Sequence, residues 1–130
     1  MQFQRKVLSN GLRILTIPMP SFKSATAMIL IGAGSRYEKK QNSGVSHFLE
    51  HMAIKGTKKR PSALNISTLI DGIGGEFNAF TSKETTGYYI KSSSNHIGLS
   101  LDVLSDMLLN SLFKEEEINK EKGVIIEEIN

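Results

Sequence analysis

The stretch GVSHFLEHMAIKGT, residues 44 to 57, indicates a helix that carries two histidines and a glutamate. Apolar side chains at helical spacing form one stripe of it: Val45, Phe48, Leu49, Met52 and Ala53. Gly56 stands where it would end the helix. His47 and His51 are four residues apart, so they lie about 40° apart around the axis and one turn along it. Two imidazoles in that relation can reach one metal ion, and Glu50 is close enough to reach a water molecule there.

An ordinary amphipathic helix is the alternative, with one histidine in solvent and the other satisfied in the core. The apolar stripe argues against it. It places Glu50, His47 and His51 along one border of the buried face, where three polar groups without partners are costly. The order His-x-x-Glu-His is also the inverted zincin motif. Because a five-residue pattern also arises by chance, the motif alone leaves both interpretations open.

The rest of the sequence predicts an α+β fold with a mostly antiparallel sheet and helices packed on one of its faces. Residues 3–20 are typical of two strands joined by a tight turn at Asn10-Gly11. Residues 24–38 predict a third strand. It is apolar on both faces near its end, so we expect it in the centre of the sheet.

Beyond the motif helix, Ser62 is expected to cap a second helix that ends at the GIGG segment. Residues 76–94 return to strand character with a bend near residues 81–84. Asn95 is expected to cap an amphipathic helix, and residues 114–130 predict a last helix that is acidic in its first turns. With no internal repeat or linker, residues 1–130 are expected to form a single domain.

The composition is typical of a globular domain, with 39% hydrophobic and 22% charged residues and a net charge of +3. The basic segment KGTKKRP, residues 55–61, is expected to be a solvated loop, and we expect no nucleic-acid binding because no aromatic residues interleave it. The absence of cysteine excludes disulfides and thiolate metal ligands. The longest apolar run, residues 25–34, is too short to span a bilayer, so we expect a soluble, cytoplasmic protein with no membrane partner.

A catalytic zinc site needs a third protein ligand, and without cysteine the natural source is a carboxylate of the last helix. If Ile118, Ile125 and Ile129 form its buried centre, Glu128 falls about 80° from that centre, whereas Glu127 falls about 180° away. Glu121 is two turns before Glu128 and about 20° from it around the axis. We therefore predict Glu128 as a metal ligand, and Glu121 as an acceptor that orients a histidine or fixes the charge of the site.

Four ordered segments resemble the pitrilysin (insulinase) family of zinc metallopeptidases, the inverzincins, on its processing-peptidase-like branch. They are LSNGLRIL near the start, GVSHFLEHMAIKGT, IGGEFNAFTSKETTGYY, and EKGVIIEEI at the end. Together they cover almost the whole chain, in the order and spacing of the family.

The resemblance implies a zinc-dependent metalloendopeptidase that hydrolyses peptide bonds. It implies Zn²⁺ bound by His47, His51 and Glu128, with Glu50 as the catalytic base and Glu121 as a second catalytic carboxylate. It also implies an edge strand at Phe77, Asn78 and Ala79 that binds a peptide substrate as an added strand. The alternative for this segment is a plain sheet strand, with Phe77 and Phe80 in the core.

Complete members of the family are longer, so the resemblance implies that this chain is an incomplete N-terminal metallopeptidase domain. A second homologous half or subunit is the expected partner, since in the family it supplies groups that stabilise the transition state. Two alternatives follow: a non-catalytic assembly subunit, or an inactive truncated fragment. The intact motif favours the enzyme, and the peptide preference belongs to regions outside these residues.

Overall fold

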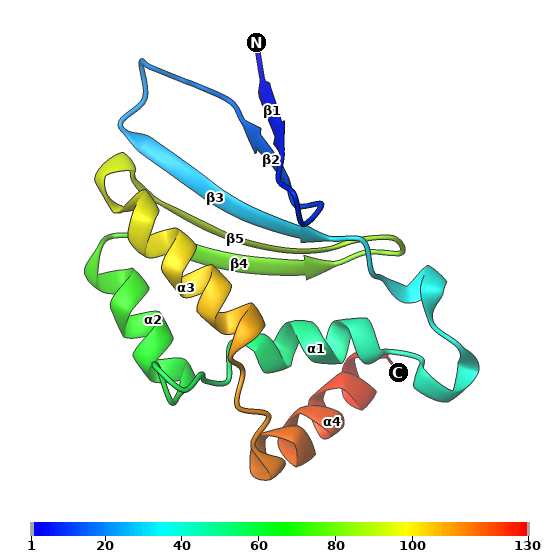
Figure 1. The fold of residues 1–130 in the computed structure, drawn as a ribbon. Helices are drawn as coiled ribbons and strands as arrows, with labels where there is room; N and C mark the ends of the chain where they lie inside the picture. Colours follow the sequence, from blue (N-terminus) through cyan, green and yellow to red (C-terminus); the bar gives the residue numbers. More distant parts are fainter. Residues whose placement is uncertain (1, 130) are drawn as a thin grey trace.

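The structure is a computed structural model that describes residues 2–129, and it has the mixed α+β architecture that the sequence predicts (Figure 1). The strands are β1 (Gln4–Val7), β2 (Arg13–Thr16), β3 (Ser24–Ile31), β4 (Glu76–Thr81) and β5 (Thr86–Ser93). The α-helices are α1 (Val45–Ala53), α2 (Ala63–Gly72), α3 (Ile97–Leu109) and α4 (Glu115–Ile129). All strand pairs are antiparallel, in a β1–β2 hairpin and a three-stranded sheet.

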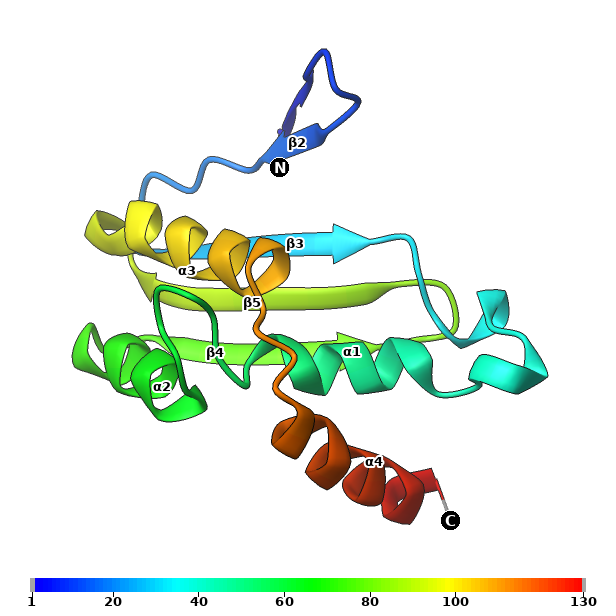
Figure 2. The same cartoon turned by 60° about the horizontal axis from the view of Figure 1, so that its bottom comes forward.

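Helices α1, α2 and α3 lie on one face of the three-stranded sheet (Figure 2). Helix α3 packs against β3 and β5, whereas α2 packs against β4 and α1 against β4 and β5. The core between the layers is apolar: Ala27, Ala53, Ile66, Ile70, Tyr88, Ile90, Val103, Leu104 and Met107. The predicted arrangement, an antiparallel sheet with helices on one face, is therefore confirmed.

Strand β3 lies at an edge of its sheet, so the expectation that it is central was wrong. The strand order is β3-β5-β4, because β5 pairs with both other strands. Along β3 the side chains alternate in exposure: Ala27 is buried, whereas Met28 and Leu30 point to the face without helices and are 48% and 59% exposed. The strand looked central because this outer face is also apolar.

The first hairpin turns where the sequence predicts. Gly11 has a φ of +86°, which glycine adopts readily, and the side-chain Oδ1 of Asn10 accepts a hydrogen bond from the Leu12 N–H at 3.1 Å. The Leu8 N–H donates to the Leu12 carbonyl, which closes the turn between β1 and β2.

Of the two predicted helix caps, one is confirmed and one was wrong. Ser62 caps α2 as expected, since its Oγ accepts the Asn65 N–H at 3.1 Å. Asn95 does not cap α3. The chain leaves β5 through a short 3₁₀ helix, Ser94–His96, so α3 begins at Ile97 and has His96 at its N-cap position without a side-chain hydrogen bond.

The basic segment 55–61 is only partly the solvated loop that was expected. Lys58 and Lys59 are exposed, but Thr57 and Arg60 are buried. Arg60 is buried because its guanidinium forms ion pairs with Asp102 and Asp106 on α3. A charge pattern in the sequence does not reveal such partners.

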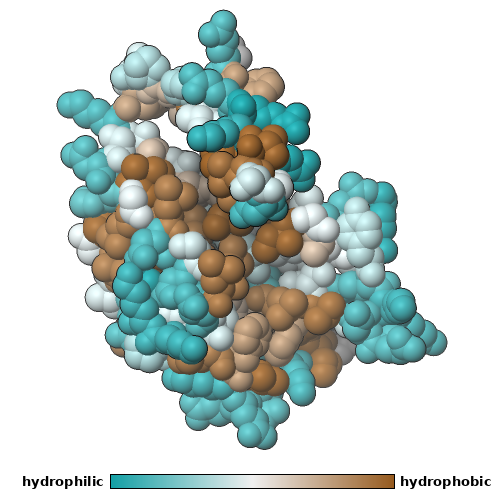
Figure 3. Space-filling model, in the orientation of Figure 1, coloured by the Kyte–Doolittle hydropathy of each residue, from teal (hydrophilic) through white to brown (hydrophobic). Residues whose placement is uncertain are grey.

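Among residues 2–129, no helix combines the length and apolar character needed to cross a membrane. Hydrophobic surface (brown) nevertheless covers much of the middle of the molecule in Figure 3, between hydrophilic (teal) margins. Exposed apolar side chains lie on the hairpin, on the outer face of β3 and on the helices, among them Val7, Leu15, Leu30, Leu64, Leu101 and Leu109.

Candidate metal centre

A carboxylate from the loop before helix α1 fixes the start of this helix. Gly44 occupies the N-cap position with a φ of +88° and has no side chain to cap the helix. Glu38 replaces it: its two carboxylate oxygens accept the N–H groups of Gly44 and Ser46 at 2.6 and 2.8 Å. Burial would raise the pKa of Glu38, but these backbone hydrogen bonds outweigh it and lower the pKa. The first turn of the histidine helix is therefore held by an anion at its positive end.

Helix α4 packs against α1, and this packing brings the acidic helix to the two histidines. Glu121 and Ile125 of α4 are buried, whereas Glu127 is exposed, as the helical spacing predicts. Glu121 was expected on the border but is 5% exposed, because it faces α1. The side chain of Ile129 lies outside the described residues.

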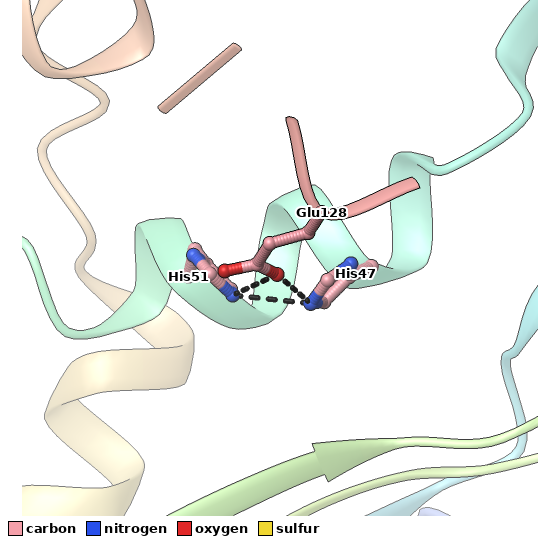
Figure 4. A group of neighbouring side chains, drawn as sticks. All are labelled: His47, His51 and Glu128. Atoms are coloured by element: carbon pink, nitrogen blue, oxygen red, sulfur yellow. Dashed lines mark hydrogen bonds and ion pairs between the residues drawn. The ribbon is translucent and has the colours of Figure 1, made fainter. Parts of the chain in front are cut away.

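His47, His51 and Glu128 converge on one point (Figure 4). The Nε2 atoms of the two histidines are 3.1 Å apart, and Oε2 of Glu128 lies 3.3 Å from Nε2 of His47 and 3.9 Å from Nε2 of His51. The imidazole rings are nearly perpendicular, with an interplanar angle of 89°. Three electron-pair donors from two helices thus surround a single position.

This donor set fits a zinc ion. Two imidazole nitrogens and one carboxylate are a ligand set of catalytic zinc sites, which leave a fourth position open. Tetrahedral ligands at about 2.0–2.1 Å from zinc lie about 3.3–3.4 Å from one another. Two of the three separations match that value within a few tenths of an ångström, and Glu128 is about half exposed and needs only a small shift toward His51.

Glu121 holds His51 from the side away from the convergence point. Its Oε2 lies 2.9 Å from Nδ1 of His51, and its Oε1 pairs with the Nζ of Lys55. Burial alone would raise the pKa of Glu121, but hydrogen bonds and charge from Lys55 and His51 lower it, so the carboxylate is ionised. An ionised carboxylate only accepts, so Nδ1 of His51 carries the proton and Nε2 presents its lone pair to the metal position.

Glu50 lies on the side of α1 that faces the sheet. Its Oε2 accepts a hydrogen bond from Oγ1 of Thr81, at the end of β4, and the side chain is half-buried. Burial, with a contribution from the charge of Glu50, raises the pKa of Tyr88 to about 12, so this phenol is protonated at neutral pH. Glu50 is thus separate from the three converging donors, although it directly precedes His51 on α1.

Sequence reasoning missed Lys55 and Thr81. Each had a signal: Lys55 is one helical turn after His51, and Thr81 is two residues after Ala79 and so on the same face of the strand.

Strand β4 carries the predicted substrate-binding residues and lies at the other edge of the sheet. Phe77 and Ala79 are half-buried and pack on the core, whereas Asn78 and Phe80 face away and are exposed, so Phe80 is not a core residue. Among the described residues no strand pairs with the outer side of β4. There the Ala79 N–H donates to Oδ1 of Asn78 at 2.8 Å.

Comparisons with known proteins identify the family of this chain. The family profile described as Insulinase (Peptidase family M16) matches residues 13–130. An uncharacterized zinc protease of Streptomyces coelicolor is 49% identical over 126 residues, 97% of this chain and 27% of that protein. The mitochondrial-processing peptidase subunit beta of Rattus norvegicus is 44% identical over 122 residues, 94% of this chain and 24% of that protein.

A solved structure has the same fold. The crystal structure of a protease from Helicobacter pylori superposes with a TM-score of 0.92 at 30% sequence identity, covering 98% of this chain and 30% of that one. The chain therefore spans between 24% and 30% of the length of these three proteins.

Proposed function

This chain belongs to the insulinase family of peptidases, and from that membership we propose that it carries a zinc-dependent metalloendopeptidase site that hydrolyses peptide bonds. The observation that carries the proposal is the convergence of one donor atom each from His47, His51 and Glu128 within 4.8 Å of one another. Relatives that are named zinc proteases support the choice of metal.

We assign His47, His51 and Glu128 as the residues that hold zinc. When bound, zinc would lower the pKa of a water molecule toward neutrality and polarise the carbonyl of the peptide to be cut. Glu121 keeps the proton of His51 on Nδ1, so that Nε2 is available as a ligand.

Glu50 is the proposed base. One of its oxygens is held by Thr81, which leaves the other, Oε1, to take the proton of the attacking water. The water oxygen bonds to the carbonyl carbon, the carbon–nitrogen bond breaks, and Glu50 passes the proton to the leaving amine nitrogen.

The peptide is proposed to bind in extended form along the outer edge of β4. Backbone hydrogen bonds to a strand edge give affinity with little dependence on sequence. The Ala79 N–H, which now donates to Asn78, would turn to a carbonyl of the peptide. Phe77 would shape the same edge from beneath, because its side chain packs on the core.

We further propose that residues 1–130 act as one incomplete domain whose efficient cleavage needs a second homologous half or subunit. The support is the low share of each relative that this chain covers, 27% in the Streptomyces coelicolor protein. The 130-residue chain alone is then expected to bind zinc weakly and to cleave peptides slowly. Robust cleavage by the monomer would overturn this part of the proposal.

Metal content and turnover together test the function. Elemental analysis after equilibration at a fixed, buffered zinc concentration should find equal zinc contents in the wild type and in Glu50→Gln, and much less in His47→Ala. Cleavage of a quenched fluorescent peptide at high protein concentration should be lost in both variants. Normal cleavage by Glu50→Gln would remove Glu50 from the mechanism. Equal zinc content in His47→Ala and the wild type would favour the alternative in which the histidines are structural.

A further inference from the structure

A buried ionic cluster lies where the loop after α1 meets α3, apart from the metal centre. It consists of Thr57, Arg60 and Asp106, which are 0%, 6% and 7% exposed. None of the three has a part in the proposed chemistry. Burying two charges without a purpose is unfavourable, so the cluster needs a structural or functional reason.

The hydrogen bonds of the cluster close the loop on itself and on α3. Oγ1 of Thr57 donates to Oδ2 of Asp106 at 2.6 Å and accepts the N–H of Arg60 at 2.8 Å. The guanidinium of Arg60 donates through Nη1 to the same Asp106 oxygen at 2.6 Å. Asn110 donates to the other oxygen of Asp106 at 3.0 Å. Asp106 therefore fixes one short piece of loop against α3 through Oδ2, and its Oδ1 is held by the residue that ends α3.

The same loop also binds the segment that leads into α4. The Leu112 N–H donates to the Gly56 carbonyl at 3.0 Å, and Thr57 forms a β-bridge with Ser111. The Nζ of Lys114 donates to the Pro61 carbonyl at 2.8 Å. Helix α4 begins at the next residue, so its starting point is set by these contacts.

The location of the cluster connects the two helices of the metal centre. Helix α1, which carries both histidines, ends at Ala53, just before the loop. Helix α4, which carries Glu121 and Glu128, packs mainly on α1 and lies at the margin of the molecule (Figure 1). A shift of the segment before α4 would therefore move both glutamates relative to the histidines.

We infer that Thr57, Arg60 and Asp106 are positioning residues for the metal centre, which lock the end of the histidine helix to the start of the glutamate helix. The inference rests on the proposed function, since it concerns the proposed zinc ligands. Thr57 connects α3 to the segment before α4, because it contacts Asp106 through its side chain and Ser111 through its backbone.

Thr57→Val is the sharpest test, because it removes the hydroxyl and keeps the shape of the side chain. The matched control is Ser100→Ala. Ser100 is also fully buried, its hydroxyl pairs with that of Ser92 at 3.0 Å, and it lies on α3 away from the loop. Thr57→Ser restores the hydroxyl. Lys114→Met removes an exposed contact of the same lock and leaves the core unchanged.

Zinc affinity in metal-buffered titrations is compared with the thermal midpoint of the metal-free chain for each variant. Thr57→Val should weaken zinc binding about tenfold or more, as loss of groups that orient ligands does. Ser100→Ala should stay within about twofold of the wild type. Thr57→Ser should recover most of the affinity, and Lys114→Met should lose about threefold. Hydrogen exchange of the α4 amides in the metal-free chain should rise in Thr57→Val and stay unchanged in Ser100→Ala.

If Thr57→Val and Ser100→Ala bind zinc equally well, the lock has no role at the metal centre and the inference is wrong. If Thr57→Val does not fold, the zinc affinity of Lys114→Met tests the inference instead. An unchanged affinity in Lys114→Met would contradict it. A wild-type chain that takes up no zinc would overturn the proposed function and, with it, this inference. If the wild type takes up zinc normally but Thr57→Val binds it as well as Ser100→Ala does, only the inference fails and the proposed function stands.

Discussion

At the scale of single residues, Glu121 shows how one side chain determines the chemistry of another. It uses both carboxylate oxygens, one toward Lys55 and one toward His51. Its negative charge fixes the proton of His51 on Nδ1 and orients the ring, so a neighbour that touches no metal decides whether Nε2 is a ligand. Replacing Glu121 should therefore change the affinity of the site for zinc.

Glu121→Gln should weaken zinc binding about 10- to 100-fold, because an amide is a weaker acceptor and can present its NH₂ group to the histidine instead. Metal-buffered titration measures the change. Glu127→Gln on the exposed side of the same helix is the matched control and should leave the affinity unchanged. Equal affinities in the two variants would show that Glu121 does not orient His51.

Asp106 gives a pH prediction at the same scale. Burial would raise its pKa, but hydrogen bonds from Thr57, Asn110 and Arg60, together with the charge of Arg60, lower it. A carboxylate whose pKa is lowered on folding stabilises the protein above its unfolded pKa of about 3.9, and that stability is lost as pH falls through the folded value.

Asp106→Asn should therefore be less stable than the wild type at pH 7, by about 1.5 kcal/mol, because Arg60 loses one of its two carboxylate partners and keeps only Asp102. The gap should narrow as the pH falls below the unfolded pKa of about 3.9, because Asp106 then takes up a proton in the unfolded wild-type chain before it does so in the folded one. Urea unfolding at several pH values measures both effects. A gap that stays constant down to the lowest pH would mean that Asp106 is not the titrating group.

At the scale of elements, helix α1 depends on a cap from outside its own sequence. Glu38 binds the N–H groups of Gly44 and Ser46 across a loop that contains a short 3₁₀ helix, Lys40–Asn42. Glu38→Ala should lower the free energy of unfolding by about 1 kcal/mol, the usual effect of losing a helix cap. Urea denaturation measures it, with Glu76→Ala on an exposed strand position as the control. Equal losses in both variants would contradict a capping role.

The elements that the sequence predicted well are those whose signals are local. The apolar stripe of α1, the Ser62 cap and the Asn10-Gly11 turn are all present, since each depends on residues within a few positions. The position of β3 in the sheet and the burial of Arg60 were wrong, because each depends on partners far away in the sequence. Helix capping by Asn95 failed for a local reason, the intervening 3₁₀ helix.

The candidate site shows the same division. Helical spacing was enough to place Glu121 and Glu128 on one side of α4, but it did not say that α4 crosses α1 at the histidines. The need for a third zinc ligand in a chain without cysteine and the four-motif resemblance linked the two helices, and the structure brings the donor atoms together. The loop contacts of Asp106 are long-range, and no pattern in the sequence indicates them or the cap that Glu38 provides.

At the scale of the whole molecule, the three-stranded sheet has one covered face and one exposed face. Neighbouring residues of β3 test this arrangement directly, since Ala27 faces the helices and Met28 faces away. Ala27→Lys should unfold the chain or lower its stability by several kcal/mol, because a charge would enter the core. Met28→Lys should change it by less than about 0.5 kcal/mol. Similar effects of the two substitutions would contradict the register of β3 with β5.

The central proposal is that helix α4, packed on helix α1, brings Glu128 to the histidines to form a zinc site, although His47 and Glu128 are 81 positions apart in the sequence (128 − 47 = 81). X-ray absorption at the zinc edge, measured on the zinc-loaded chain, tests it most directly. The predicted spectrum has two imidazole nitrogens and carboxylate oxygen at about 2.0–2.2 Å, and it loses one protein oxygen in Glu128→Ala. A spectrum with one imidazole or none, or one that Glu128→Ala leaves unchanged, would contradict the account.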